Sequence, residues 1–475
     1  MTIPWDPILK ALKTYWGYDH FRPPQDEIVR CLLEKRDALV ALPTSSGKSL
    51  CFQIPAILTS GITLVISPLI ALMEDQVQDL RKRRLAAATL HSQMSGFQRR
   101  QVLQAVARHQ IRLLYLAPET LFSEAVWPIL VDPALPINGL MIDESHTLVH
   151  WGESFRPDYR RLGSVRSALG KSFPVAAFTA TADAYTQKVL QEVLQLHQPT
   201  LIQVSPFRPN LHLHISMAWT PALRKQQTHQ FIQRQQGSAG LVYVRTRQEA
   251  KDLTAWLRNQ GWLTATYHGG LGAEQRRQLE QDWLEDRCPF LVCTNAFGMG
   301  INKPNCRWVL HYRPAASISD YVQEVGRGGR DGEVARALML VSEPSGFLDP
   351  TDRQLADFLS QQRQQSQRQA RQALKQLPDH GSLAEWLAQA GSEGKLTLAL
   401  LHQAACLEWR DPFHFRILKR DFPNQRDPLF QDPAEGMRQL IESRHCRWQV
   451  IRRAFGDVGG DPCGCCDNCR KQQKR

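Results

Sequence analysis

Ala38-Leu-Val-Ala-Leu-Pro-Thr-Ser-Ser-Gly-Lys-Ser-Leu50 is the stretch that decides the fold, because an apolar strand runs directly into a Gly-Lys-Ser loop and a helix. Such a loop turns backbone N–H groups and a lysine toward phosphate oxygens, and the helix N-terminus adds its dipole. An ordinary strand-to-helix turn with a basic residue is the alternative for the loop alone. The pattern predicts a phosphate-binding site at Thr44, Ser45, Ser46, Gly47, Lys48 and Ser49.

The composition is that of a globular protein with a polyanionic partner. The chain has 475 residues, 43% hydrophobic and 22% charged, with a net charge of +12. This length allows two to four domains, and the positive charge favours nucleic acid over a membrane surface. We see no membrane-spanning stretch and no secretory signal at Met1-Thr-Ile-Pro-Trp5. Most of the eleven cysteines are scattered singly, which is typical of a reducing compartment, so we expect a cytoplasmic protein, nucleoid-associated if bacterial.

Short apolar runs alternate with helical patterns along most of the chain. Near-continuous apolar strands between helices indicate parallel sheets covered on both faces. The fold class is therefore α/β, with two tandem parallel-sheet domains followed by a small helical zinc-binding region. We predict domains at residues 1–204, 205–348, 349–436 and 437–475.

The third of these segments, 349–436, reads as a helical linker with an insert. Residues 361–375 are rich in Gln and Arg and indicate either an exposed basic helix or a polar connector. Two short helical patterns at 382–388 and 396–401 precede a strand-like pair, 407–409 and 413–417. Helices followed by a hairpin suggest a winged-helix-like unit, and a plain packing insert is the alternative.

Asp143-Glu-Ser-His146 ends another apolar strand of the first domain. A carboxylate there can hold Mg²⁺, and the adjacent Glu144 can deprotonate an attacking water. A surface acidic turn is the alternative for these four residues alone. In the second domain, Arg327 and Arg330 lie three residues apart in Gln323-Glu-Val-Gly-Arg-Gly-Gly-Arg-Asp331. On a helix this spacing puts both guanidinium groups on one face, suited to phosphoryl oxygens or simply to solvent.

Four C-terminal cysteines, Cys446, Cys463, Cys466 and Cys469, follow the pattern C-x16-C-x2-C-x2-C. Two C-x-x-C steps suit tetrahedral thiolate coordination of Zn²⁺. Four thiolates leave no open position, so we interpret the zinc as structural. A disulfide cluster and a redox-active thiol group are the alternatives, and Cys465 is left over.

These motifs in this order resemble superfamily 2 helicases, specifically the RecQ family. The resemblance covers about residues 10–345 and 437–469. It is carried by Tyr18, Phe21, Arg22 and Gln25, and by the segments 67–76, 143–146, 151–159, 178–182, 297–304, 323–331, 444–448 and 454–457. The family implies two RecA-like domains and a zinc-binding segment.

The resemblance also implies roles in binding and hydrolysing ATP. Tyr18 would stack on adenine, and Arg22 and Gln25 would recognise the base. The remaining roles are as follows: Lys48 on the β- and γ-phosphates, Ser49 and Asp143 on Mg²⁺, Glu144 as general base, Arg327 and Arg330 on the γ-phosphate, and Gln323 in the same arginine motif.

Trp151, Phe155 and Arg156 match the family's aromatic-rich loop, which couples DNA contact to hydrolysis. Aromatic rings beside a basic residue can form a stacking platform for unpaired bases. Without the motif context, a Trp/Phe cluster in the core is the alternative.

The resemblance therefore implies an ATP-, Mg²⁺- and Zn²⁺-dependent DNA helicase, translocating 3′ to 5′ and acting on tailed or branched duplex in repair and recombination. We expect a monomer that partners single-strand-binding protein. A superfamily 2 RNA helicase and a nucleic-acid-binding protein with a weak ATPase site are the alternatives.

Several residues depart from the family pattern. Serines replace the usual glycines at Ser45 and Ser46, and a serine that needs positive φ costs of order 1 kcal/mol, which puts nucleotide affinity in question. Ser145 and Gly328 stand where alanine is usual. The chain ends soon after Cys469, so we expect the family's winged-helix and terminal helical domains to be absent.

Overall fold

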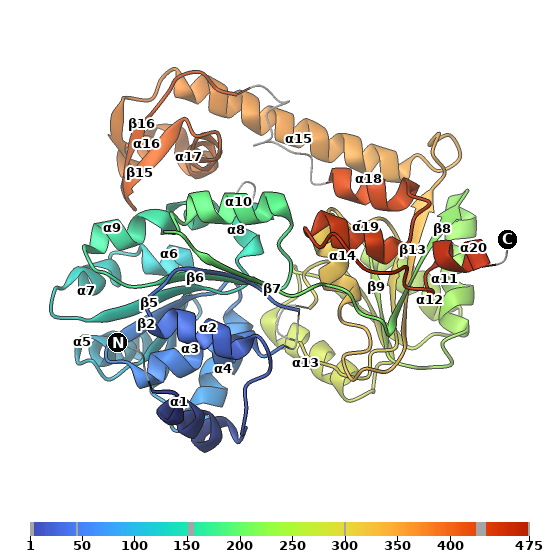
Figure 1. Ribbon diagram of the computed structural model, residues 1–475. Coiled ribbons are helices and arrows are strands. Elements are labelled where there is room, and N and C mark those ends of the chain that lie inside the picture. The colour runs from blue at the N-terminus through green and yellow to red at the C-terminus, as the bar shows by residue number, and fades with distance from the viewer. Residues whose placement is uncertain (1–3, 44–45, 151–155, 299–300, 424–433, 474–475) are drawn as a thin grey trace. The chain divides into compact units, whose positions relative to one another are not determined.

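The computed structural model describes residues 4–43, 46–150, 156–298, 301–423 and 434–473. It forms two compact units: residues 1–204 with 364–430, and residues 205–363 with 431–475. Helix α15 (Thr351–Leu374) contains one of the points where the chain passes between them. Each unit is built on its own parallel sheet, as the fold class predicts (Figure 1). The four-part division of the chain stays a prediction.

The first unit contains a seven-stranded sheet in which every described pairing is parallel. Its order is β3 (Ala87–Leu90), β4 (Leu113–Leu116), β2 (Ile62–Ile66), β5 (Ile137–Ile142), β6 (Val175–Thr179), β1 (Ala38–Ala41) and β7 (Thr200–Gln203). Because the strands are parallel, their carboxyl ends meet at one edge, where the phosphate loop and Asp143 both begin.

Helices cover both faces of this sheet (Figure 1). Apolar side chains of α2 (Gln25–Leu33), α3 (Lys48–Leu58) and α4 (Ile70–Lys82) fill one face. The other face is covered by α5 (Gly96–Ala107), α6 (Pro118–Leu121), α7 (Trp127–Val131), α8 (His146–His150), the 3₁₀ segment η2 (Pro157–Ser164), α9 (Val165–Leu169) and α10 (Ala184–Val193). An N-terminal pair, α1 (Trp5–Ala11) and the π-helical turn η1 (Leu12–Trp16), packs on α2 and α3.

The first unit also holds the insert predicted near residues 382–420. It has a three-stranded antiparallel sheet of order β14 (His380–Ser382), β16 (His414–Ile417) and β15 (Leu407–Asp411). Between β14 and β15 run α16 (Leu383–Ala390), η3 (Gly391–Glu393) and α17 (Gly394–Gln403). Trp386, Leu401, Trp409 and Phe415 form a core of their own with the end of α15.

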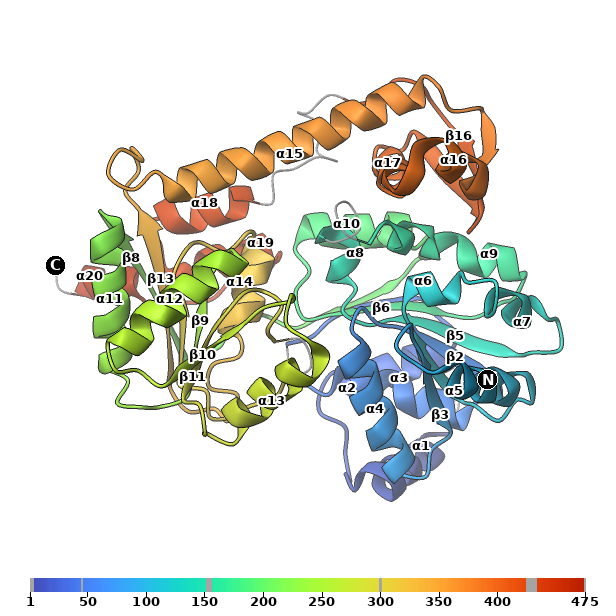
Figure 2. The ribbon, with the colours of Figure 1, turned by 180° about the vertical axis from the view of Figure 1, so that it is seen from behind.

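The second unit has a six-stranded parallel sheet. Its order is β10 (Thr264–Tyr267), β11 (Phe290–Cys293), β9 (Gly240–Tyr243), β12 (Trp308–His311), β13 (Ala335–Ser342) and β8 (Leu211–Ala218). Apolar residues of α11 (Pro221–Gln233) and α12 (Arg247–Asn259) cover one face (Figure 2). The other face packs against α13 (Ala273–Leu284), α14 (Ile318–Val325), α18 (Ala434–Glu442) and α19 (Arg447–Ala454), with α20 (Asp467–Gln473) following.

Candidate nucleotide and zinc sites

The glycine–lysine–serine loop joins β1 to α3, as the sequence predicts. Gly47 has a φ of +76°, in the left-handed region that favours glycine. Ser46 is not among the residues with positive φ, and its hydroxyl donates a hydrogen bond to the Pro43 carbonyl at 2.7 Å. Ser46 therefore does not carry the backbone strain that a serine with positive φ would have. Thr44 and Ser45 lie outside the described residues.

Gln25 connects the segment before the loop to the loop itself. Its Nε2 donates to the Ser46 carbonyl at 2.8 Å, and its Oε1 accepts from the Arg22 backbone at 3.0 Å. A Cβ on Gly47 would lie 2.6 Å from that Nε2, so only glycine leaves Gln25 in this position. Tyr18 and Arg22 are exposed, Tyr18 by 52%.

Lys48, Asp143 and Glu144 lie together at the carboxyl edge of the first sheet. Lys48 Nζ is 3.6 Å from Glu144 Oε1, and both side chains are largely buried. The Glu144 backbone N–H donates to Asp143 Oδ1 at 3.0 Å. Burial, followed by the Glu144 charge, raises the pKa of Asp143 to about 7, while Lys48 acts in the opposite direction. Two buried carboxylates side by side favour a cation between them.

The backbone of this cluster is itself unusual. Glu144 has a φ of +47°, a conformation that bulky side chains seldom adopt. Hydrogen bonds from the Asp143 N–H to the Ile66 carbonyl and from the Ser145 N–H to the Phe178 carbonyl, both 2.8 Å, hold the turn between β2 and β6. Such strain persists only where the surroundings enforce it, and it is concentrated at functional sites. Lys48 Nζ is buried with no hydrogen-bond partner among the described residues, so it suits an anionic ligand.

His146 belongs to this site although the sequence analysis assigned it no role. His146 Nδ1 lies 3.1 Å from Thr179 Oγ1 and 3.4 Å from Glu144 Oε2. Thr179 Oγ1 in turn donates to the Thr181 carbonyl at 2.8 Å. His146 therefore links the acidic turn to the Thr-Ala-Thr turn after β6. Only its place in the Asp-Glu-Ser-His motif could have indicated this.

The three residues predicted to contact DNA are only partly described. Trp151 and Phe155 lie outside the described residues. Arg156 directly precedes η2, and its Nη1 lies 3.8 Å from Glu119 Oε2. Its side chain is 21% exposed, so a DNA phosphate can reach it.

Arg327 and Arg330 converge in the second unit, although the helical reasoning behind them was wrong. Helix α14 ends at Val325, and both arginines lie in the turns that follow, because the Gly-rich run cannot extend the helix. Arg327 Nη1 donates to the Gly298 carbonyl, and Arg330 Nη1 to the Ile301 carbonyl at 3.0 Å. The two guanidinium groups therefore donate to backbone carbonyls only three residues apart, those of Gly298 and Ile301.

This pair of arginines is well suited to an anion. Burial and then the Arg327 charge lower the pKa of Arg330 to about 10, so it stays charged at neutral pH. The Nε groups of both arginines are buried without a hydrogen-bond partner in the described part of the chain. Gly298, with a φ of +135°, makes room for Arg327: an added Cβ would lie 2.1 Å from the Arg327 Cζ. Gln323 is half-buried on α14.

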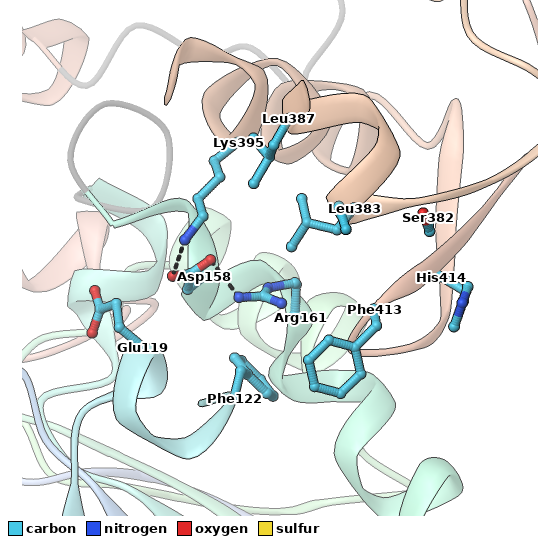
Figure 3. A pocket seen from close by; sticks show the side chains of 11 residues that line it. Glu119, Phe122, Asp158, Arg161, Ser382, Leu383, Leu387, Lys395, Phe413 and His414 are labelled. Atoms are coloured by element: carbon cyan, nitrogen blue, oxygen red, sulfur yellow. Dashed lines mark hydrogen bonds and ion pairs between the residues drawn. The ribbon is translucent and has the colours of Figure 1, made fainter. Parts of the chain in front are cut away.

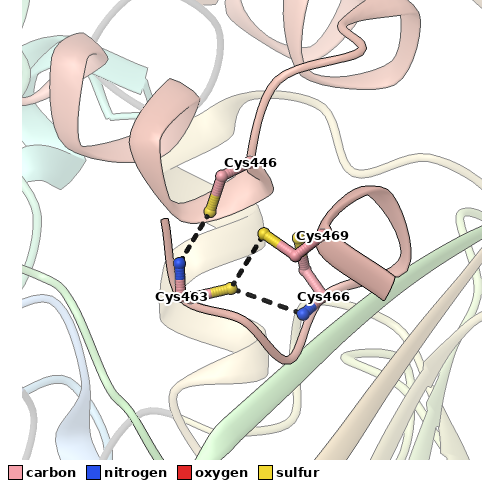
Figure 4. A group of neighbouring side chains, drawn as sticks. All are labelled: Cys446, Cys463, Cys466 and Cys469. Atoms are coloured by element: carbon pink, nitrogen blue, oxygen red, sulfur yellow. Dashed lines mark hydrogen bonds between the residues drawn. The ribbon is translucent and has the colours of Figure 1, made fainter. Parts of the chain in front are cut away.

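The predicted zinc ligands converge in the second unit (Figure 4). The Sγ atoms of Cys446, Cys463, Cys466 and Cys469 all lie within 4.8 Å of one another. Backbone N–H groups donate to three of these sulfurs: Cys463 N to Cys446 Sγ at 3.3 Å, Cys466 N to Cys463 Sγ at 3.3 Å, and Arg447 N to Cys466 Sγ at 3.5 Å. Four converging sulfurs with N–H donors fit a tetrahedral Zn²⁺ thiolate site.

The cysteine cluster is anchored on the second sheet. Trp448 is buried, and its Nε1 donates to the Leu211 carbonyl of β8 at 3.0 Å. Arg447 forms a buried two-point ion pair with Asp467, with both N–O distances 2.9 Å. Cys466 and Cys469 share a core with β8, β13 and α14. A change in the geometry of these four cysteines would therefore disturb the second unit itself.

No helix in the described part of the chain is long and apolar enough to cross a bilayer.

Family models match three stretches of this chain. They are a DEAD/DEAH box helicase model over residues 22–189, a helicase conserved C-terminal domain over 223–332 and a RecQ zinc-binding model over 419–470. Together these cover the phosphate loop, both arginines and all four cysteines.

Relatives and solved structures agree with these matches. An ATP-dependent DNA helicase RecQ of Synechocystis sp. is 50% identical over 468 residues, covering 97% of each chain. The RecQ of Haemophilus influenzae is 36% identical over 98% of this chain, which spans 64% of that relative. The fold resembles Saccharomyces cerevisiae Dbp5 bound to RNA and ADP BeF3, with a TM-score of 0.57, 15% identity, and coverage of 72% of this chain and 90% of that one.

Proposed function

The chain belongs to the RecQ family of DNA helicases, and on that basis we propose that it hydrolyses ATP to move along DNA and separate its strands. The observation that carries this proposal is the cluster of Lys48, Asp143 and Glu144. It combines a buried lysine, whose Nζ has an ion pair with Glu144 but no hydrogen-bond partner among the described residues, with two adjacent carboxylates. The cluster lies at the carboxyl edge of a parallel sheet, where such folds bind nucleotides.

The phosphate loop and the residues before it bind ATP in this proposal. Tyr18 stacks on the adenine, and Arg22 and Gln25 recognise its edge. The loop, Thr44 to Ser49, surrounds the phosphates, and Lys48 Nζ exchanges its contact with Glu144 for the β- and γ-phosphate oxygens. The exposed Tyr18 supports the first assignment, and the buried Lys48 Nζ, which lacks a hydrogen-bond partner among the described residues, supports the last.

Hydrolysis then depends on the acidic pair and the two arginines. Ser49 and Asp143 would hold Mg²⁺, which neutralises phosphate charge when bound. Glu144 accepts the proton of the attacking water, and His146 orients that carboxylate through the 3.4 Å contact. Arg327 and Arg330 stabilise the charge that develops on the γ-phosphate, with Gln323 beside them.

The zinc has a structural role in the proposal. Cys446, Cys463, Cys466 and Cys469 would hold it, and with four thiolate ligands it has no open position for catalysis. Its contribution is to tie α19 and α20 to the second sheet, where Trp448 and Arg447 already make buried contacts.

The nucleic acid is DNA, contacted by Trp151, Phe155 and Arg156, and the direction is 3′ to 5′. Tailed and branched duplexes in repair and recombination are the substrates of this proposal. We further propose that the protein is monomeric, that it is cytoplasmic or nucleoid-associated, and that it binds single-strand-binding protein. The net charge of +12 supports a polyanionic partner.

Strand separation tests this function directly. Wild type and Lys48→Ala are given ATP with 3′-tailed, 5′-tailed and blunt DNA duplexes and with a 3′-tailed RNA duplex. Wild type should unwind the 3′-tailed DNA and hydrolyse ATP faster with single-stranded DNA, and Lys48→Ala should do neither. Equal activity in both proteins, or stimulation by RNA alone, would refute the proposal.

A further inference from the structure

The insert in the first unit has the element order of a winged-helix unit. The end of α15 is followed by β14, then α16 and α17, and then the hairpin β15–β16. A helix-turn-helix unit that reads DNA places its second helix in the major groove. Here that helix is α17, and the hairpin corresponds to the wing.

Helix α17 is turned toward its own unit. It packs against η2, and Leu398, Leu400 and Leu401 are buried. Gln403 Nε2 lies 3.1 Å from the Tyr185 hydroxyl of α10. Its one lysine, Lys395, has its Nζ 3.0 Å from Asp158 Oδ2 of η2. A helix that enters a DNA groove needs exposed cationic side chains that can bind phosphates. The only lysine of α17 is already in an ion pair with Asp158.

The tip of the hairpin is likewise occupied. Phe413 lies against Phe122 and Trp127, with ring centroids 6.4 and 5.5 Å apart. Arg161 Nη1 of η2 donates to the Pro412 carbonyl at 2.7 Å. Both parts of the insert that would meet duplex DNA are therefore bound to the layer of helices over the first sheet.

Asp158 lies at the centre of this contact between the insert and η2, which we call the joint (Figure 3). Asp158 is 3% exposed, and its carboxylate lies between Arg161 Nη2, at 2.6 Å, and Lys395 Nζ, at 3.0 Å. Burial lowers the pKa of Arg161 although Asp158 opposes that shift. Removing one partner of a buried carboxylate is destabilising, so we expect the loss of Lys395 to loosen η2 even though Arg161 still holds Asp158.

The joint reaches the residue predicted to contact DNA. Asp158 follows Arg156 by two residues, and Arg156 lies 3.8 Å from Glu119. Glu119, Asp158, Arg161 and Lys395 line one cavity of about 450 Å³ between the insert and the α6–η2 layer (Figure 3). An interface with charged walls and open volume can change its side-chain contacts more easily than a dense apolar core can.

We propose that Lys395, acting through Asp158, is a positioning residue for Arg156, and that the insert braces the first unit instead of reading duplex DNA. The brace sets how strongly DNA binding stimulates ATP hydrolysis. This inference rests on the proposed DNA-dependent ATPase.

Three substitutions test it: Lys395→Ala, Lys395→Arg and the control Lys375→Ala. Lys375 is an exposed cation of the same region with no ion pair among the described residues. Hydrogen exchange over residues 156–164 should rise in Lys395→Ala and remain as in wild type in the other two. The maximal rate of ATP hydrolysis with single-stranded DNA should fall about fivefold in Lys395→Ala, with the half-saturating DNA concentration changed less than about twofold. Lys395→Arg should restore the rate.

Two results would overturn the inference. Unchanged exchange over 156–164 in Lys395→Ala would show that the ion pair does not position this segment. Duplex affinity that falls alike in Lys395→Ala and Lys375→Ala would show that the insert is a DNA-binding surface. Hydrogen exchange needs no catalytic activity, so a wild type without DNA-stimulated hydrolysis would refute the proposed function separately.

Discussion

Gly47→Ala tests whether the phosphate loop depends on both the backbone angle and the open space at this position. An alanine at φ +76° costs about 1–2 kcal/mol in the left-handed region. Its Cβ would lie 2.6 Å from Gln25 Nε2, so the amide must leave the Ser46 carbonyl, which costs about 1 kcal/mol more. The two costs sum to about 2–3 kcal/mol. If this whole free energy opposes the loop conformation that binds ATP, the affinity for ATP falls about 30- to 150-fold.

The two contributions separate in a double-mutant cycle. Titration of a fluorescent ATP analogue with Mg²⁺ gives a dissociation constant for wild type, Gly47→Ala, Gln25→Ala and the double variant. With the Gln25 amide removed, the alanine should cost only the backbone share, about 1–2 kcal/mol. A coupling of about 1 kcal/mol between the two positions is therefore expected.

A second glycine provides the control for backbone strain alone. Gly170 has a φ of +59° and open space around its missing Cβ, in the same unit but after α9. Gly170→Ala should lower thermal stability and leave nucleotide affinity unchanged. Wild-type affinity in Gly47→Ala, or an equal loss with and without the Gln25 amide, would refute the reasoning.

Three further predictions concern the other features of the molecule. Gly298→Ala should displace the Arg327 guanidinium and lower the DNA-stimulated rate of ATP hydrolysis at least about 100-fold, measured by phosphate release. Cys463→Ser should remove bound zinc, measured by mass spectrometry, and lower the melting temperature, because the cluster shares the core of the second sheet. Burial, with help from Arg160, lowers the pKa of His402 to about 3. The unfolded chain therefore binds this proton near its ordinary pKa, about 6.5, while the folded chain does not, so stability is full above that pH and falls as the pH drops toward 3. His402→Leu should lose less stability than wild type between pH 7 and 5.

Each of these has a result that would contradict it. Gly272→Ala, at an open site before α13 with ordinary φ, should leave hydrolysis unchanged, so an equal loss there would remove the case for Gly298. Zinc retained by Cys463→Ser would mean that the ligand set is wrong. An identical pH dependence of the melting temperature in His402→Leu and wild type would show that the pKa of His402 is not lowered in the folded chain.

Local signals made the framework of the molecule predictable. The strand ending at Ala41 and the run at 140–143 were predictable because buried parallel strands are continuous apolar segments, and the structure confirms both. The four cysteines were predictable because zinc ligands repeat at short spacing, and their sulfurs do converge.

The remaining features depend on tertiary context. The spacing of Arg327 and Arg330 indicated a helix, but Gly-rich turns follow Val325. The pair converges through contacts with Gly298 and Ile301, which lie 29 residues earlier in the sequence. Nothing in the sequence near Lys395 points to Asp158, 237 residues earlier. The link from His146 to Thr179 likewise joins the start of α8 to the end of β6, which meet because β5 and β6 are neighbours in the sheet.

Glu144→Gln provides the most direct test of the central claim, that Lys48, Asp143 and Glu144 form the ATPase site of a DNA motor. The substitution keeps the shape of the side chain and removes the base. In a single-turnover assay with single-stranded DNA, the variant should bind ATP as wild type does and hydrolyse it at least about 100-fold more slowly. Hydrolysis at the wild-type rate would contradict the account.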